Sequence, residues 1–156
     1  MTVRAPLATY TAQERTHAFV RKAALCFAAG CAGGLANSIV VWLLGALGIT
    51  AALGVGIAPE FTPAWLYPRI VWGGLWGFLF LLPVLRSTPY MSGLVWSLGP
   101  TLVQLLIIFP FKADKGVFGL ELGALTPLFV FIFNVIWGLV AAAILVRIDC
   151  EESPVS

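Results

Sequence analysis

Three carboxamide side chains stand in otherwise apolar stretches of the sequence: Asn37, Gln104 and Asn134. Counted from the expected cytoplasmic ends of their helices at about 1.5 Å per residue, all three fall at a depth of about 20 Å. Trp72 falls at the same level. Because an amide in hydrocarbon loses several kcal/mol when it has no partner, we expect these side chains to turn inward and to bond one another, an indole N–H or free backbone groups.

The predicted polar layer of Asn37, Trp72, Gln104 and Asn134 has two interpretations. In the first it is a structural staple between helices, worth about 0.6 to 2 kcal/mol per hydrogen bond. In the second it is the binding site for a lipid tail, a quinone, a pigment or a small solute. The residue types alone favour the first interpretation and leave the second open.

Groups that perform catalysis or hold metal ions are scarce. His17 is the only histidine. Cys26 and Cys31 would point about 140° apart around one helix, so they cannot share a metal ion or a disulfide. The sequence contains neither a phosphate-binding glycine loop nor a nucleophile elbow. We therefore predict no catalytic residue, no metal site, no cofactor and no enzyme activity.

Charged side chains are expected only outside the hydrocarbon. Glu60, Asp114 and Glu121 fall in expected loops, where solvated charges are the default. Arg69 is expected to snorkel to the interface beside Tyr67. The absence of charge from the expected interior disfavours proton-driven or ion-driven transport, which needs ionisable groups at depth.

Two pairs of glycines form Gly-x-x-x-Gly patterns, Gly30 with Gly34 and Gly73 with Gly77. Small residues on one face of a helix allow another backbone to approach closely. These faces either pack on each other within the monomer or meet a second subunit or partner helix. Both arrangements predict that the glycines are helix-packing positions.

The pair Gly99 and Pro100 interrupts a long apolar stretch. A proline inside a helix removes one backbone hydrogen bond and leaves the carbonyl four residues earlier without its partner. The sequence therefore predicts a kink here, which is either static or a hinge that lines a cavity.

Long apolar helices are needed to position these residues. The sequence contains four apolar stretches of about 20 residues, and a helix of that length crosses about 30 Å of hydrocarbon. The expected spans are residues 23–49, 68–85, 89–111 and 127–146. Together they form an expected transmembrane domain of residues 23–147, between an N-terminal cytoplasmic segment (1–22) and a C-terminal cytoplasmic tail (148–156).

Several helix starts are marked by a hydroxyl followed by proline or by a capping box. Thr88 and Thr126 each precede a proline and are expected to cap their helices. Thr62 gives the same signal before the second span. Thr11 and Glu14 form a capping box, which predicts an amphipathic helix from about residue 12 that continues into the first span.

The composition supports a membrane protein. Of 156 residues, 60% are hydrophobic and 10% are charged, and the mean hydropathy is +0.99. Soluble domains carry about 25% charged residues, and a chain of this length cannot hide so much apolar surface in one soluble core. A net charge of +2 is too small to indicate a nucleic-acid partner. The predicted fold class is all-α: a polytopic integral membrane protein built as a four-transmembrane-helix bundle.

The basic residues predict the orientation. Most of the nine Lys and Arg fall on the face that also carries both ends of the chain. Because basic residues accumulate on the cytoplasmic side, both termini are expected there, with the protein in a bacterial inner membrane.

Two functions from different classes fit these observations. The first is a non-catalytic multi-pass protein that acts through helix–helix contacts, as an accessory or assembly subunit of a membrane complex or as a homo-oligomer. The alternative is a small transporter or channel for a neutral or lipid-like solute, lined by the polar layer. The expected partners are the lipid bilayer and other membrane helices, with no nucleic acid.

Overall fold

The computed structural model describes residues 12–85 and 88–152, with side chains placed as far as residue 148. These residues form helices joined by short connections, and no strand occurs among them. The elements, in chain order, are α1 (Ala12–Ala46), α2 (Ile49–Ala52), α3 (Pro63–Gly77), η1 (Phe78–Leu81), α4 (Pro89–Val103), η2 (Gln104–Lys112), η3 (Val117–Leu122) and α5 (Thr126–Glu152).

The all-helical class is confirmed, and three helices are long and apolar enough to cross a membrane: Ala12–Ala46, Pro89–Lys112 and Thr126–Ile148. The fourth helix, α3, has 15 residues and is shorter than such a span requires. The first of the three covers both the predicted N-terminal helix and most of the predicted first span. The Thr11 position of the capping box lies outside the described residues.

The helix in the region of the second predicted span occupies different residues from those expected. It begins at Pro63, where the Thr62 hydroxyl accepts a hydrogen bond from the Trp65 N–H at 3.3 Å, and Pro68 lies inside it. It tightens into the 3₁₀ turn η1 after Gly77, and the backbone becomes extended at Leu82. That residue precedes Pro83, and a proline disfavours helical geometry in the residue before it.

The helix starts predicted at Pro89 and Pro127 are confirmed to within one residue, but neither Thr88 nor Thr126 caps its helix with a side-chain hydrogen bond. Thr88 precedes α4, but its backbone (φ −135°, ψ 74°) differs from the extended geometry of Thr62, and its side chain accepts no cap hydrogen bond. The Thr126 hydroxyl is buried and has no hydrogen-bond partner in the described part of the chain. Thr126 is itself the first residue of α5, so its backbone is already helical.

The helix that contains Gly99 and Pro100 stays α-helical through both residues. The change in helical geometry comes at Gln104, where α4 gives way to the π-helix η2. Pro110 lies inside η2 and cannot donate a backbone hydrogen bond. π-helical segments occur frequently at functional sites.

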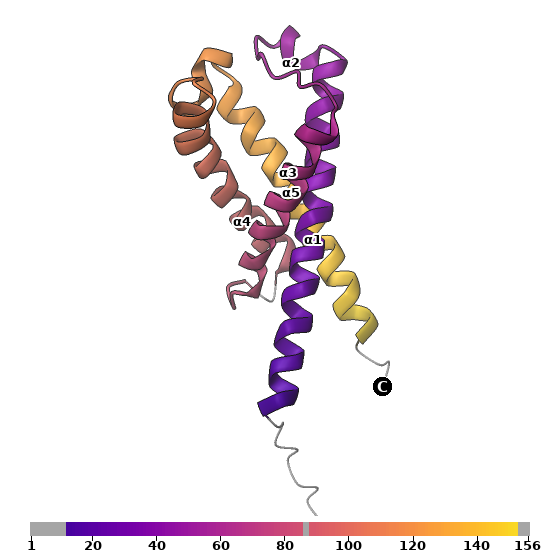
Figure 1. Ribbon diagram of the computed structural model, residues 1–156. Coiled ribbons are helices and arrows are strands. Elements are labelled where there is room, and N and C mark those ends of the chain that lie inside the picture. Colours follow the sequence, from indigo (N-terminus) through magenta and orange to yellow (C-terminus); the bar gives the residue numbers. More distant parts are fainter. Residues whose placement is uncertain (1–11, 86–87, 153–156) are drawn as a thin grey trace, which may run out of the picture.

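The four longer helices pack in the order α3, α1, α5, α4, and α3 scarcely touches α4 (Figure 1). We call the end of the molecule that carries α2 and η3 the loop end; the two described ends of the chain lie at the opposite end (Figure 1). The loop end is closed by a hydrogen bond from the Gly56 N–H to the Leu122 carbonyl, 2.6 Å long, and by the buried side chain of Val55. Three sides of the bundle are therefore closed by helix packing. On the fourth side the backbones of α3 and α4 stay apart, and the Trp76 ring of α3 lies against Gly99 of α4.

Glycines bring the backbones of α1 and α3 into direct contact. A Cβ added at Gly73 would lie 2.7 Å from the carbonyl oxygen of Gly30 and 2.9 Å from the Cα of Gly34. A Cβ added at Gly77 would lie 3.1 Å from the Cα of Gly30. Both Gly-x-x-x-Gly faces are thus occupied by each other within one chain.

A second glycine contact, which the sequence analysis did not single out, joins α4 and α5. A Cβ added at Gly93 would lie 2.5 Å from the carbonyl oxygen of Gly138. Each pair of helices is therefore held at backbone distance, and the polar side chains described below lie between the two pairs.

Candidate functional site

The amides of Asn37 and Asn134 meet between α1 and α5. Asn37 donates through Nδ2 to the Phe133 carbonyl at 2.7 Å and to Asn134 Oδ1 at 3.3 Å. Asn134 in turn donates to the Thr101 hydroxyl of α4 at 3.1 Å. Both amides are buried, so this chain of hydrogen bonds ties α1, α5 and α4 together in the interior.

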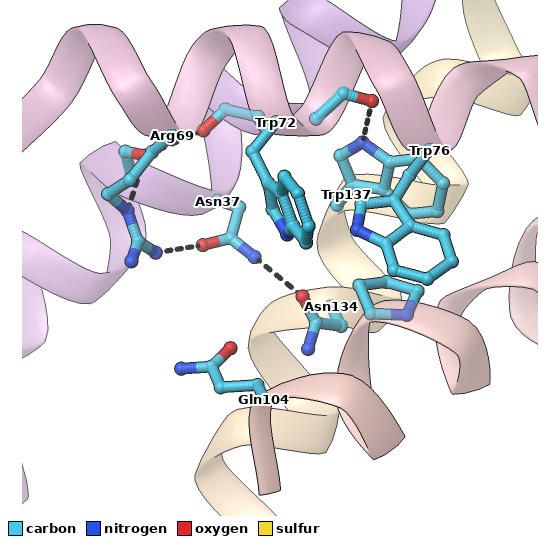
Figure 2. A pocket seen from close by; sticks show the side chains of 11 residues that line it. Asn37, Arg69, Trp72, Trp76, Gln104, Asn134 and Trp137 are labelled. Atoms are coloured by element: carbon cyan, nitrogen blue, oxygen red, sulfur yellow. Dashed lines mark hydrogen bonds between the residues drawn. The ribbon is translucent and has the colours of Figure 1, made fainter. Parts of the chain in front are cut away.

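The guanidinium of Arg69 joins this chain, and the expectation that it snorkels to the interface is wrong. Its Nη2 donates to Asn37 Oδ1 at 2.8 Å and its Nε donates to the Ser38 hydroxyl at 3.0 Å. The Trp65 ring lies against it, with the guanidinium carbon 4.7 Å from the ring centroid. Figure 2 shows Arg69 directed toward Asn37 rather than away from the bundle.

A signal for this placement was present in the sequence. Arg69, Gly73 and Gly77 follow one another at intervals of four residues, so they lie on one face of a helix. That face packs on α1, which carries Asn37 and Ser38. The position of Arg69 near the start of its span suggested the interface, whereas its position around the helix places it on the face that packs on α1.

Trp137 closes the interior on the side away from the loop end. Its indole N–H donates to the carbonyl of Gly30 at 3.1 Å and to that of Gly73 at 3.2 Å, at the point where α1 and α3 cross. The side chain is 2% exposed. Phe80 of η1 packs on it with ring centroids 6.1 Å apart.

The four residues of the predicted polar layer line one cavity, which we call the central cavity. Asn37, Trp72, Gln104 and Asn134 share its wall with Arg69, and Trp76, Trp137 and Pro100 complete it. The cavity itself is small, about 60 Å³. Figure 2 shows the indoles of Trp72 and Trp76 beside Asn134, and their ring centroids are 5.9 Å apart at 85°.

Two larger hollows share Arg69 and Gln104 with the central cavity. One, of about 290 Å³, extends toward the loop end among mostly apolar side chains that include Val41, Phe109 and Phe133. The other, of about 280 Å³, lies between α3 and η2; we call it the lateral opening. Its wall is Pro68, Arg69, Trp72, Gln104, Ile108 and Lys112. It is situated on the fourth side of the bundle, where α3 and α4 scarcely touch.

Two side chains of the central cavity have hydrogen-bonding groups without partners. The indole nitrogen of Trp76 is buried and makes no hydrogen bond within the described residues. Gln104 has no hydrogen-bond partner in residues 12–85 and 88–152 either, and its amide extends into the space below Asn37 and Arg69 (Figure 2). The Gln104 amide is therefore free to bond an occupant of the cavity, whereas the Trp76 nitrogen is covered by protein atoms.

The wall of the central cavity offers amides, indoles and one guanidinium as polar groups. None of the three hollows has an aspartate, a glutamate, a histidine or a cysteine in its wall. In the described part of the chain, no cluster of three or more such residues could hold a metal ion. The chain matches no protein-family model, no curated protein and no solved structure.

Proposed function

We propose that this chain is a multi-pass membrane protein that binds a small lipid-like molecule in the central cavity and the hollows that adjoin it, as a carrier or transporter and without catalysing a reaction. The observation that carries the proposal is the amide of Gln104, which lines this cavity beside Arg69 and has no hydrogen-bond partner among the described residues. A ligand with several acceptor atoms would bond this amide and the Arg69 guanidinium at once.

The staple interpretation accounts for only part of the polar layer. Asn37, Asn134 and Thr101 bond one another, and they join α1, α5 and α4 without any ligand. Gln104 makes no such bond among the described residues, although it lines the same cavity. A residue that served only as a staple would be bonded to a neighbour.

The route to the cavity supports a ligand that comes from the bilayer. At the loop end a hydrogen bond joins Gly56 to Leu122, and the hollow on that side is lined mostly by apolar side chains. The lateral opening between α3 and η2 faces the side where the helices are not packed together. A molecule dissolved in the membrane would reach Arg69 by moving between these two elements.

We also propose that the chain crosses the membrane four times, as a four-transmembrane-helix bundle in a bacterial inner membrane with both termini in the cytoplasm. The 15 residues of α3 rise about 22 Å, and the four of η1 add about 8 Å, which together match about 30 Å of hydrocarbon. The chain can therefore return across the bilayer between the loop end and α4. The distribution of Lys and Arg supports the orientation.

Native mass spectrometry of the full chain, extracted from its own membrane in a mild detergent, tests the binding function. We expect a particle that retains a small molecule. We expect Gln104→Leu to raise the Kd about fivefold through the loss of one hydrogen bond of about 1 kcal/mol, and so to lower the bound fraction. Gln13→Leu, at an exposed position of α1 far from the cavity, is the matched control and should leave the bound fraction unchanged. Absence of any small molecule from the wild-type particle would refute the proposal.

The second candidate is the function in assembly through helix–helix contacts. The two Gly-x-x-x-Gly faces no longer argue for it, because they meet within the monomer. It is favoured instead by the exposed side chains of Met91, Val95, Leu98 and Leu102, whose spacing of four, three and four residues matches a coiled-coil seam on α4. The same mass measurement decides: a complex with a second chain supports this candidate, and a monomer with a bound small molecule supports the first.

A further inference from the structure

We infer that the ligand of the central cavity is an anionic amphiphile, with a carboxylate or phosphate group bound at Arg69 and an apolar part in the lateral opening. This inference rests on the proposed binding function and adds the charge and the shape of the ligand.

Arg69 has no negatively charged side chain beside it in the hollows that it lines. Its two hydrogen-bond partners, the Asn37 carbonyl oxygen and the Ser38 hydroxyl, are both neutral. No carboxylate lines any of the three hollows that Arg69 shares. Charged groups within a membrane domain almost always pair with an opposite charge or face a functional cavity. Arg69 faces the cavity, so the opposite charge belongs to an occupant.

The second step is the kind of group that the free positions can bind. An arginine carries five N–H donors in a planar fork, and the Nη1 of Arg69 has no partner among the described residues. The Gln104 amide, in the wall of the same cavity, supplies further donors. Carboxylate and phosphate groups are acceptors with several oxygens, and guanidinium binds them in a bidentate fashion.

The third step is the orientation of the guanidinium. It is held between Trp65 on one side and the Asn37 and Ser38 acceptors on the other. Stacking on an indole and two hydrogen bonds fix the plane of the fork before a ligand arrives. A fixed donor fork lowers the entropic cost of binding an anion.

The fourth step is the shape of the lateral opening, which distinguishes an amphiphile from a free ion. The opening combines the apolar side chains of Pro68, Trp72 and Ile108 with Arg69 at its inner end, and Lys112 adds a second cation to its wall. An apolar chain can lie there while the acidic group reaches Arg69. A free phosphate ion has no apolar part that could contact these apolar side chains.

Thermal unfolding of the full chain in an uncharged maltoside detergent tests the inference. We expect dioleoylphosphatidylglycerol, an anionic lipid, to raise Tm by about 5 °C or more at concentrations far above its Kd. The zwitterionic dioleoylphosphatidylcholine and sodium phosphate should raise it much less. Comparing the three Tm shifts distinguishes binding of an acidic amphiphile from binding of a neutral amphiphile or of a free anion.

Variants of the cavity connect the shift to its residues. Arg69→Met should weaken phosphatidylglycerol binding about thirtyfold or more, as expected when one member of a buried charge pair is removed. Arg147→Met makes the same exchange at an exposed position outside the three hollows and should keep the full shift. Gln104→Glu breaks no hydrogen bond among the described residues and places a carboxylate in the cavity. It should raise Tm without lipid and abolish the shift, so the inference stays testable even if Arg69→Met does not fold.

Three outcomes would overturn the inference. An equal shift with phosphatidylcholine would show that the charge of the ligand does not matter, and retention of a neutral molecule that depends on Gln104 would then leave the proposed function standing. A full shift with sodium phosphate alone would replace the amphiphile by a free anion. No binding of any lipid, together with a native particle free of small molecules, would refute the inference and the proposed function together.

Discussion

Trp137 shows how much of this interior depends on single side chains. One indole N–H reaches two backbone carbonyls, on Gly30 and Gly73, which belong to different helices. Those carbonyls are accessible only because neither glycine carries a side chain at the crossing. The α5 helix is thereby attached to α1 and α3 at one point.

The first prediction concerns this attachment. Trp137→Phe removes the shared N–H and should lower the free energy of unfolding by about 1 to 2 kcal/mol more than Trp96→Phe does. Trp96 is a matched control, since its buried indole nitrogen has no hydrogen-bond partner among the described residues. Unfolding of both variants in a titration with sodium dodecyl sulphate measures the difference. Equal losses would show that the two carbonyls gain nothing from Trp137.

Some site residues could be predicted from the sequence and others could not. Depth counting identified Asn37 and Asn134, because a carboxamide in an apolar stretch is conspicuous and its height follows from the helical rise. Arg69 was misjudged, since a long cationic side chain near a helix end ordinarily reaches the interface. Its side chain points inward because it donates hydrogen bonds to Asn37 and Ser38, which are distant from it in sequence. The free indole of Trp76 depends on packing and has no signature in the sequence.

At the scale of elements, glycine-mediated contacts decide how the helices pair. The α1–α3 and α4–α5 contacts leave no space for a β-carbon. The second prediction is that Gly73→Ala destabilises the protein by about 1 to 3 kcal/mol, because the added carbon meets backbone that cannot rotate away.

Gly56→Ala is the control for that substitution. A Cβ there would lie 3.6 Å from its nearest neighbour, the Leu122 carbonyl oxygen, which is an ordinary contact. We expect a change within about 0.5 kcal/mol, as for other surface substitutions. If Gly73→Ala unfolded at the same detergent fraction as Gly56→Ala, the close crossing of α1 and α3 would be refuted.

The ends of the elements were less predictable than their existence. Thr62 and Pro63 form a true helix start, whereas Thr88 and Thr126 carry the same sequence signal without a capping bond. The difference lies in backbone angles, which neighbouring elements set. The π-helix η2 was not predicted at all, because apolar periodicity does not distinguish π-helix from α-helix within nine residues.

At the scale of the molecule, the apolar composition predicts the membrane class, but the open side of the bundle follows only from the order of packing. Helices α3 and α4 are neighbours in sequence and scarcely touch, because α1 and α5 stand between them in the packing order. No pattern within a single helix determines that order. The position of the lateral opening could therefore not be derived from the sequence.

The third prediction concerns topology. Single cysteines introduced at Glu60 and Lys115, in a background without the native cysteines, should react with a membrane-impermeant maleimide from the same side. A cysteine at Arg147 should react from the opposite side. With three crossings instead of four, Glu60 and Lys115 would be labelled from opposite sides, so the experiment decides the number of spans directly.

The edge-to-face pair of Trp72 and Trp76 gives the protein an optical property of its own. Two indoles 5.9 Å apart at 85° are close enough for their electronic transitions to couple. Both form part of the wall of the central cavity, so an occupant would touch the pair and alter its ultraviolet circular dichroism and its emission. Occupancy could therefore be followed by spectroscopy in an unlabelled sample, even before the occupant has been identified.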